Sequence, residues 1–169
     1  MAPQDLKDVA GQLESARAEL IALVSRLTEE QARTRPAPDR WSVLECREHV
    51  NFVERRFLRM VRESEAGPPA ERDAARAALM ERVTDRSNRR TATEALHPAG
   101  RYRSISEALQ DFNAVRDETL RFASEGCEPA VAERSPSCVR PLNGVETLLL
   151  IGFHGRRHTA QMREAAEGR

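Results

Sequence analysis

Three histidines have the side-chain type and the positions needed to bind a metal ion. His154 and His158 are four residues apart in a helix-forming segment, so both imidazoles lie on one face of that helix. His49 lies much earlier in the chain, on the apolar stripe of a second helical segment. Imidazole nitrogens suit zinc, nickel, copper or ferrous iron, and three protein ligands leave a coordination position open. The sequence therefore predicts a three-histidine site for a divalent metal ion, with zinc and nickel as the preferred candidates.

A purely structural interpretation of the same histidines stays open. Two histidines at this spacing also occur by chance, and a single histidine on an apolar helix face is more often a core residue than a ligand. The metal hypothesis gains support because all three histidines are expected to face the interior of a chain that otherwise keeps charge out of its core stripes. The alternative is a helical bundle that binds no metal.

Three polar residues could assist such a site and are the catalytic candidates. Gln161 follows His158 by about one turn and could orient this ligand or hold a water molecule. Glu45 precedes His49 by one turn and could be a fourth ligand or a base, although its position also fits a helix cap. Arg116 could steer an anionic substrate, and an ion pair at the bundle surface is an equally good interpretation.

Two further residues capable of chemistry are expected to be inert. Cys46 lies one turn before His49 and could supply a thiolate, but a buried and unreactive cysteine is the better interpretation. His97 precedes Pro98 in a loop, out of register with the other histidines, and is assigned no role. Trp41 is expected to pack the entry of the following helix onto the core.

The segments that must position these residues have the periodicity of amphipathic helices. Leucines recur every seven residues through the first segment, and prolines follow it. A serine and a glutamate at capping-box spacing begin two later helices, at Ser42 and Ser104. The apolar stripe of the second helix is expected to bury Phe52 together with its neighbours. Five helices are predicted, over residues 5–31, 43–64, 71–90, 104–124 and 142–166.

These helices predict an all-α fold, namely an antiparallel four-helix bundle with one additional peripheral helix. The peripheral helix is residues 71–90, whose apolar face is thin. Residues 91–103 show no periodicity and are expected to form a connection that crosses the molecule. No segment has the alternation of a strand. One domain spanning 1–169 is predicted.

The composition excludes several classes of protein. The 169 residues carry 27 basic and 27 acidic side chains, so the positive excess that non-specific nucleic-acid or anionic-membrane binding requires is absent. No apolar run reaches the length of a membrane span, and the N-terminus lacks the layout of a signal peptide. Three cysteines without paired spacing fit a reducing compartment. A soluble, cytoplasmic protein is expected, with no nucleic-acid or membrane partner.

Two stretches of the sequence resemble a known family. Residues 41–50 look like the helix opening of the DinB/YfiT-like superfamily, whose first metal-binding histidine falls at the position of His49. Residues 142–161 are similar to the C-terminal H-x-x-x-H-x-x-Q signature of that superfamily, which supplies the other two histidine ligands and here ends at Gln161. The likeness covers most of the chain between residues 41 and 166.

The resemblance implies a four-helix bundle, often dimeric, that binds a divalent cation through three histidines. Some relatives resemble transferases or isomerases that use a low-molecular-weight thiol, others are described as hydrolases by analogy, and many have no established reaction. Residues 135–141 depart from the pattern, because many relatives carry a His-Pro pair and a glycine there. This departure concerns substrate preference, since all three ligand positions are kept.

The leading hypothesis is a metal-dependent enzyme that acts on a small molecule by thiol-dependent transfer or by hydrolysis. The thiol reaction ranks slightly ahead, from the resemblance alone, and a homodimer is expected on the same ground. The alternative is a non-catalytic, metal-binding or stress-associated bundle that acts through dimerisation or partner binding.

Overall fold

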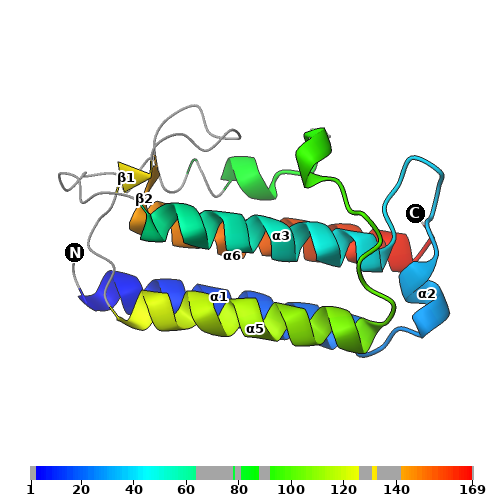
Figure 1. Ribbon diagram of the computed structural model, residues 1–169, viewed down its shortest axis with the longest axis horizontal. Coiled ribbons are helices and arrows are strands. Elements are labelled where there is room, and N and C mark those ends of the chain that lie inside the picture. Colours follow the sequence, from blue (N-terminus) through cyan, green and yellow to red (C-terminus); the bar gives the residue numbers. More distant parts are fainter. Residues whose placement is uncertain are drawn as a thin grey trace.

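Four long helices form the body of the protein in the computed structural model, which describes residues 3–63, 78, 81–87, 92–125, 131–132 and 142–168 (Figure 1). The long helices are α1 (Pro3–Val24), α3 (Val43–Arg62), α5 (Ile105–Ser124) and α6 (Gly144–Ala166). The shorter elements are α2 (Glu29–Arg33), the 3-10 helix η1 (Glu94–Leu96) and the strands β1 (Val131–Ala132) and β2 (Leu142–Asn143). The predicted all-α bundle is confirmed.

Each long helix packs against two others. α1 contacts α6 and α5, and α3 contacts the same two helices from the other side. In Figure 1, α1 and α6 run in one direction while α3 and α5 run in the opposite direction. The α1–α5 and α3–α6 pairs are therefore antiparallel, as predicted, whereas the α1–α6 and α3–α5 pairs are parallel. Since parallel neighbours cannot be joined by a tight turn, the chain between α3 and α5 must return along the bundle, which fits the predicted crossing connection.

Two of the predicted helix starts can be compared in detail. At α3, Ser42 accepts a hydrogen bond from the backbone of Glu45, whose side chain accepts one from the backbone of Ser42, so the capping box is complete. At α5, Ser104 accepts from the Glu107 backbone, but the Glu107 carboxylate accepts from the backbone N–H of Arg103 instead. The second box is therefore only half formed.

The first predicted helix, over residues 5–31, is wrong at its C-terminal end. α1 ends at Val24, and the separate helix α2 begins after Thr28. Thr28 and Gln31 form a complete capping box, with reciprocal hydrogen bonds between side chain and backbone. The leucine repeat continues through this break because Leu27 still packs against the core from the turn. The Thr28–Gln31 spacing was the sequence signal for the break.

The four helices bury two apolar clusters, one toward each end of the bundle. One cluster joins α1, α3, the end of α5 and the start of α6, and the other joins the remaining halves of the same helices. Phe52 is an exception to the predicted stripe, because its side chain is 46% exposed. It lies about 200° around α3 from the buried Val50, at 100° per residue, and so faces away from the core.

The strand prediction needs a small correction. β1 and β2 pair in antiparallel fashion, with Val131 opposite Asn143 and Ala132 opposite Leu142. This pair spans only two residues per strand and lies directly before α6, so it leaves the all-α class unchanged. Within the described residues, no helix combines the length and apolarity that a membrane crossing requires.

Most of the predicted peripheral helix, residues 71–90, lies outside the described part of the chain; within it, residues 78 and 81–84 are helical. The segment 81–87 is attached to α6 by two arginines. Arg86 donates to the Glu164 carboxylate, with Nε–Oε1 3.2 Å, and Arg157 donates to the carbonyl oxygens of Val83 and Asp85. This segment therefore covers the part of α6 that carries the C-terminal histidines.

A buried ion pair lies in the middle of the bundle. Arg116 of α5 donates from Nε and Nη2 to the two carboxylate oxygens of Glu54 on α3, at 2.8 and 2.9 Å, and from Nη1 to the Leu13 carbonyl of α1 at 2.6 Å. Thr119 donates a further bond to Glu54. Both charged side chains are about 1% exposed. The surface ion pair considered for Arg116 is therefore wrong, since the pair links three helices inside the core.

Breaking this pair should be costly because it would leave the Arg116 charge buried without compensation. Replacement Glu54→Gln is expected to lower the free energy of unfolding by about 3–5 kcal/mol. The exposed pair between Arg62 and Glu118, at 3.5 Å, offers a matched control, and Glu118→Gln should cost no more than about 1 kcal/mol. Urea denaturation followed by circular dichroism measures both, and equal losses in the two variants would contradict the assignment.

Candidate metal centre

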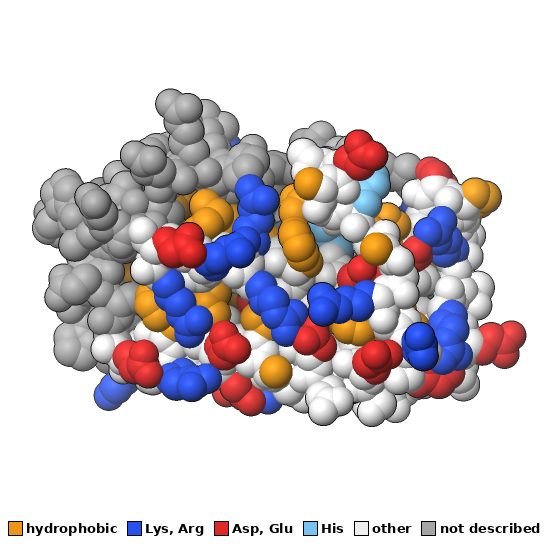
Figure 2. All heavy atoms as spheres, in the orientation of Figure 1, with side chains coloured by type: hydrophobic (Ala, Val, Ile, Leu, Met, Phe, Trp, Pro, Cys, Tyr) orange, Lys and Arg blue, Asp and Glu red, His pale blue; other side chains and the backbone are white. Residues whose placement is uncertain are grey.

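The three predicted histidines meet between α3 and α6. The ring centroids of His154 and His158 are 4.5 Å apart. The ring centroid of His49 is 5.2 Å from that of His154 and 4.7 Å from that of His158. One nitrogen from each ring lies within 4.8 Å of the other two. Figure 2 shows histidine atoms, in pale blue, on this face of the molecule, and the chain has four histidines, of which His97 is exposed. The structure thus brings together residues that are about a hundred positions apart in the chain.

The orientation of His49 is fixed by a backbone carbonyl. His49 Nδ1 is 2.8 Å from the carbonyl oxygen of Leu96, the last residue of η1. Because a carbonyl only accepts, Nδ1 must carry the proton, and Nε2 of the neutral ring is left with a free lone pair. This arrangement, in which a ligand histidine donates its other N–H to a carbonyl, is typical of metal centres.

The free nitrogen of His49 faces a second imidazole at a distance that suits a metal. His49 Nε2 is 3.3 Å from His154 Nε2. Two ligands bound at about 2.05 Å in tetrahedral geometry would lie about 3.3 Å apart. The pair could equally share one proton in a hydrogen bond. Its separation therefore fits zinc coordination without requiring it.

The third ring supplies an independent observation. His158 is 8% exposed, and its Nδ1 is buried without a hydrogen-bond partner. A buried polar atom with no partner costs free energy, so such atoms are rare in folded proteins unless a ligand, ion or water satisfies them. One ligand atom of His158 lies within 4.8 Å of the ligand atoms of the other two rings. The donor set and its unsatisfied nitrogen fit a bound divalent cation.

Burial keeps the cluster uncharged at neutral pH. It lowers the pKa of His154 to about 3, and the neighbouring charges of His49, Arg157 and Arg47 act in the same direction. Burial also places the pKa of His158 well below its usual value and lowers that of His49, although the Leu96 carbonyl partly opposes the shift at His49. Neutral imidazoles have the lone pairs that a metal requires.

Trp41 forms an aromatic wall of the cluster. The ring centroid of Trp41 is 4.9 Å from that of His49 and 6.5 Å from that of His158. The rings of Trp41 and His158 are close to parallel. His97, to which the sequence assigns no role, also packs edge-on against Trp41, with the two ring centroids 5.9 Å apart. The charge of His97 also lowers the pKa of His49. Periodicity could not reveal this position, because His97 belongs to a loop.

The assisting candidates have different fates. Gln161 is partly buried beside the His158 ring, where its hydrogen bond favours the protonated form of that ring. Glu45 completes the helix cap and accepts hydrogen bonds from Arg35, with Nε–Oε2 2.8 Å. Burial alone would raise the pKa of Glu45, but the Arg35 contact holds it below its usual value. The third candidate, Arg116, is committed to the ion pair in the core.

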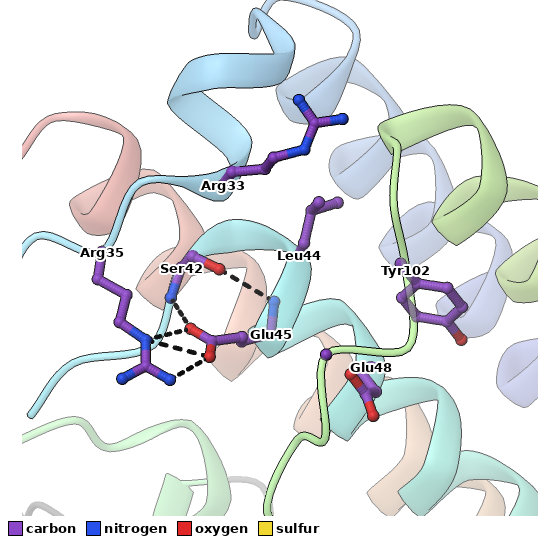
Figure 3. A pocket seen from close by; sticks show the side chains of 8 residues that line it. Arg33, Arg35, Ser42, Leu44, Glu45, Glu48 and Tyr102 are labelled. Atoms are coloured by element: carbon purple, nitrogen blue, oxygen red, sulfur yellow. Dashed lines mark hydrogen bonds and ion pairs between the residues drawn. The ribbon is translucent and has the colours of Figure 1, made fainter.

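Glu45 lines a pocket that is separate from the histidines. This hollow of about 260 Å³ lies at the start of α3, and Figure 3 shows Arg35 and Ser42 both bonded to Glu45 within it. None of the three clustered histidines lines this hollow. His154 is the one member of the cluster that is only partly buried. Of the three candidates, Gln161 is therefore the one that the structure brings to the cluster.

Cys46 lies three residues before His49 in the sequence, and its side chain is buried in the apolar core. Burial raises the pKa of its thiol to about 12, and the nearby Glu45 charge adds to this effect. The thiol is therefore protonated at neutral pH and is neither a good nucleophile nor a metal ligand. The prediction of an inert, buried cysteine agrees with this placement.

Comparison with known proteins points to one family. The family model described as the DinB superfamily matches residues 12–162. The chain is also similar to the uncharacterized protein YuaE of Bacillus subtilis (strain 168), with 26% identity over 153 residues, which cover 90% of this chain and 93% of YuaE. No solved structure gives a significant match.

The buried neutral histidines should make the metal-free protein sensitive to acid. Their pKa values are lowered on folding, so the unfolded chain binds more protons once the pH falls below the usual value of 6.5. This contribution to stability is therefore complete above about pH 6.5 and declines below it, by up to about 1.4 kcal/mol per pH unit for each ring that stays neutral in the fold. Urea denaturation at several pH values between about 7 and 5 measures this slope.

The variant His154→Gln isolates the contribution of one ring. It should reduce the slope by about 1.4 kcal/mol per pH unit, because one proton less is taken up on unfolding. An identical slope in the variant and the parent protein would show that His154 is not held neutral by the fold.

Proposed function

The chain belongs to the DinB superfamily, and within it we propose that this protein is a metal-dependent enzyme acting on a small molecule through His49, His154 and His158. The observation that carries the proposal is the convergence of three neutral imidazoles, with ligand atoms within 4.8 Å of one another. Three ligands rather than four leave room for a further group at the ion, which is typical of catalytic sites.

A zinc or nickel ion held there would lower the pKa of a water molecule or a thiol and so supply a nucleophile near neutral pH. The side chains of the site favour this role through their charge. The cluster consists of three neutral rings, and the charges of Arg157 and Arg47, both cationic, also lower the pKa of His154. Ligands of this kind leave the full charge of the ion available to an anionic group.

The remaining residues of the site would orient and enclose the reaction. The Leu96 carbonyl holds His49 in the tautomer that presents Nε2 to the ion. Trp41 covers two of the rings and excludes water from that side. Gln161 is placed to hold His158 or a polar group of the substrate through its amide. Each of these contributions comes from a different part of the chain.

Of the two reactions considered, thiol-dependent transfer is the one we propose first, with a low-molecular-weight thiol as cosubstrate. It is supported by the resemblance to thiol-using relatives and by the cationic surroundings of His154, which suit a thiolate. Hydrolysis by an activated water remains the second candidate. A cytoplasmic location and a homodimeric state, both expected from the sequence, are part of the same proposal.

Metal uptake tests the site without assuming a reaction. Protein purified without a histidine tag and dialysed against zinc should retain about one equivalent per chain by elemental analysis. His158→Ala removes one ligand and should weaken zinc binding by roughly 100-fold or more, while the helical content by circular dichroism stays nearly unchanged. The exposed Glu118 of α5, which lies outside the cluster, provides the control Glu118→Gln, and this variant should keep its zinc. Equal uptake by both variants would refute the ligand assignment.

A reaction screen tests the enzymatic part of the proposal. Zinc- or nickel-loaded protein is incubated with several cellular thiols and a panel of electrophiles, and product is followed by mass spectrometry. Adduct formation should depend on the thiol and fall to the uncatalysed rate with His158→Ala. If the wild type binds metal but turns over neither these substrates nor a panel of esters and amides, a non-catalytic role for the cation, as a link between α3 and α6, replaces the enzyme proposal.

A further inference from the structure

The segment of residues 92–103, here named the strap, is attached to α3 beside the histidine cluster. Three polar side chains within one turn of α3 contact it. His49 bonds the Leu96 carbonyl, Glu48 accepts from backbone amides further along the strap, and Asn51 donates to the Tyr102 hydroxyl at 2.8 Å. The strap has one short 3-10 helix of its own. Leu96 and Tyr102 also pack against the two apolar clusters, Tyr102 donates to Asp111 of α5, and Arg33 of α2 donates to the Arg103 carbonyl.

Glu48 binds the strap with both carboxylate oxygens. Its Oε1 accepts from the backbone N–H of Ala99, and its Oε2 accepts from the backbone N–H of Arg101, each at 2.8 Å. Gly100 lies between these two residues with a φ of +77°, a left-handed conformation that glycine adopts without strain. This turn directs both amides toward one carboxylate. Hydrogen bonds to an ionised acceptor are stronger than those between neutral groups.

The chain between this clamp and the Leu96 carbonyl is short and stiff. Only His97 and Pro98 separate Leu96 from Ala99. His97 is extended, with φ −71° and ψ 143°, as expected for a residue before proline, and the ring of Pro98 fixes its own φ. Two residues, one of which has a fixed φ, therefore link the clamp to the Leu96 carbonyl.

We propose that Glu48 is a positioning residue of the metal centre. By holding Ala99 and Arg101, it keeps the Leu96 carbonyl against Nδ1 of His49 and so keeps the Nε2 lone pair of that ring directed at the cluster. The inference rests on the proposed function in that the ring must serve as a metal ligand. Glu48 itself contacts neither the other histidines nor the ion position, and its effect is transmitted entirely through the strap.

No other carboxylate on this part of α3 can take over the task. Glu45, one turn earlier, is already committed to Arg35 and to the Ser42 backbone. If the clamp is lost, the carbonyl no longer selects one tautomer, and part of the His49 population places its proton on Nε2, where it blocks coordination. Loss of such supporting contacts typically weakens metal binding by about 10–100-fold.

The test compares two glutamates that bind strap backbone. Glu48→Gln keeps the size of the side chain but turns one acceptor into a donor that faces a backbone N–H. Glu107→Gln is the matched control, because Glu107 also accepts from a strap amide, that of Arg103 at 2.8 Å, but lies beyond the Tyr102 anchor. Zinc affinity is measured by competition with a chromophoric chelator, and the tautomer of His49 in the metal-free protein by ¹⁵N chemical shifts of its ring nitrogens.

We expect zinc affinity to fall by about 10–100-fold in Glu48→Gln and to stay within about twofold in Glu107→Gln. In the metal-free protein, His49 should change from a single Nδ1–H tautomer to a mixture in the first variant only. A merely structural tether would lower thermal stability without changing the tautomer.

The outcomes separate this inference from the proposed function. If the wild type binds zinc through the three histidines and Glu48→Gln leaves both affinity and tautomer unchanged, the clamp is refuted and the metal site stands. If the wild type fails to bind zinc, the proposed function fails. The tautomer measurement in the metal-free protein then still decides whether Glu48 controls His49, and an unchanged tautomer refutes the clamp there as well.

Discussion

The packing of three imidazole rings at one point between α3 and α6, two of them buried and the His154 ring partly buried, is the constraint on which the site depends. Each ring has polar nitrogens, and a buried nitrogen without a hydrogen-bond partner or a bound ion costs free energy. One nitrogen of His49 bonds the Leu96 carbonyl, its other nitrogen faces His154 at 3.3 Å, and Nδ1 of His158 has no partner. Desolvation keeps the rings neutral, so their lone pairs are available. A divalent cation satisfies these requirements together.

The topology of the bundle explains why a loop reaches this site. α3 and α5 run parallel, and the described parts of the connection between them, residues 81–87 and 92–103, lie along the outside of the bundle. This connection brings the strap and the segment 81–87 across the surface formed by α3 and α6. The strap provides the Leu96 carbonyl, and the segment 81–87 is attached to α6 through Arg157, a neighbour of His158. A bundle with four alternating helices would have no such covering chain.

Local patterns were enough to predict the four long helices, apart from the C-terminal end of the first, and the ligand candidates. The spacing of His154 and His158 and the capping box at Ser42 are properties of a few neighbouring residues, and the structure has both in the expected places. Periodicity failed where tertiary contacts decide. The burial of Arg116 depends on Glu54 from another helix, and the leucine repeat hid the break before α2. The contact between His49 and the strap uses a backbone carbonyl, which any residue type could supply, and so it had no sequence signal.

The coordination shell of the ion tests the central claim most directly. X-ray absorption spectra of zinc-loaded, tag-free protein should show three imidazole nitrogens at about 2.0–2.1 Å together with one or two light, non-imidazole ligands. A shell with fewer imidazoles, or one that contains sulfur, would contradict the account, because the histidines of α3 and α6 would then not hold the ion together.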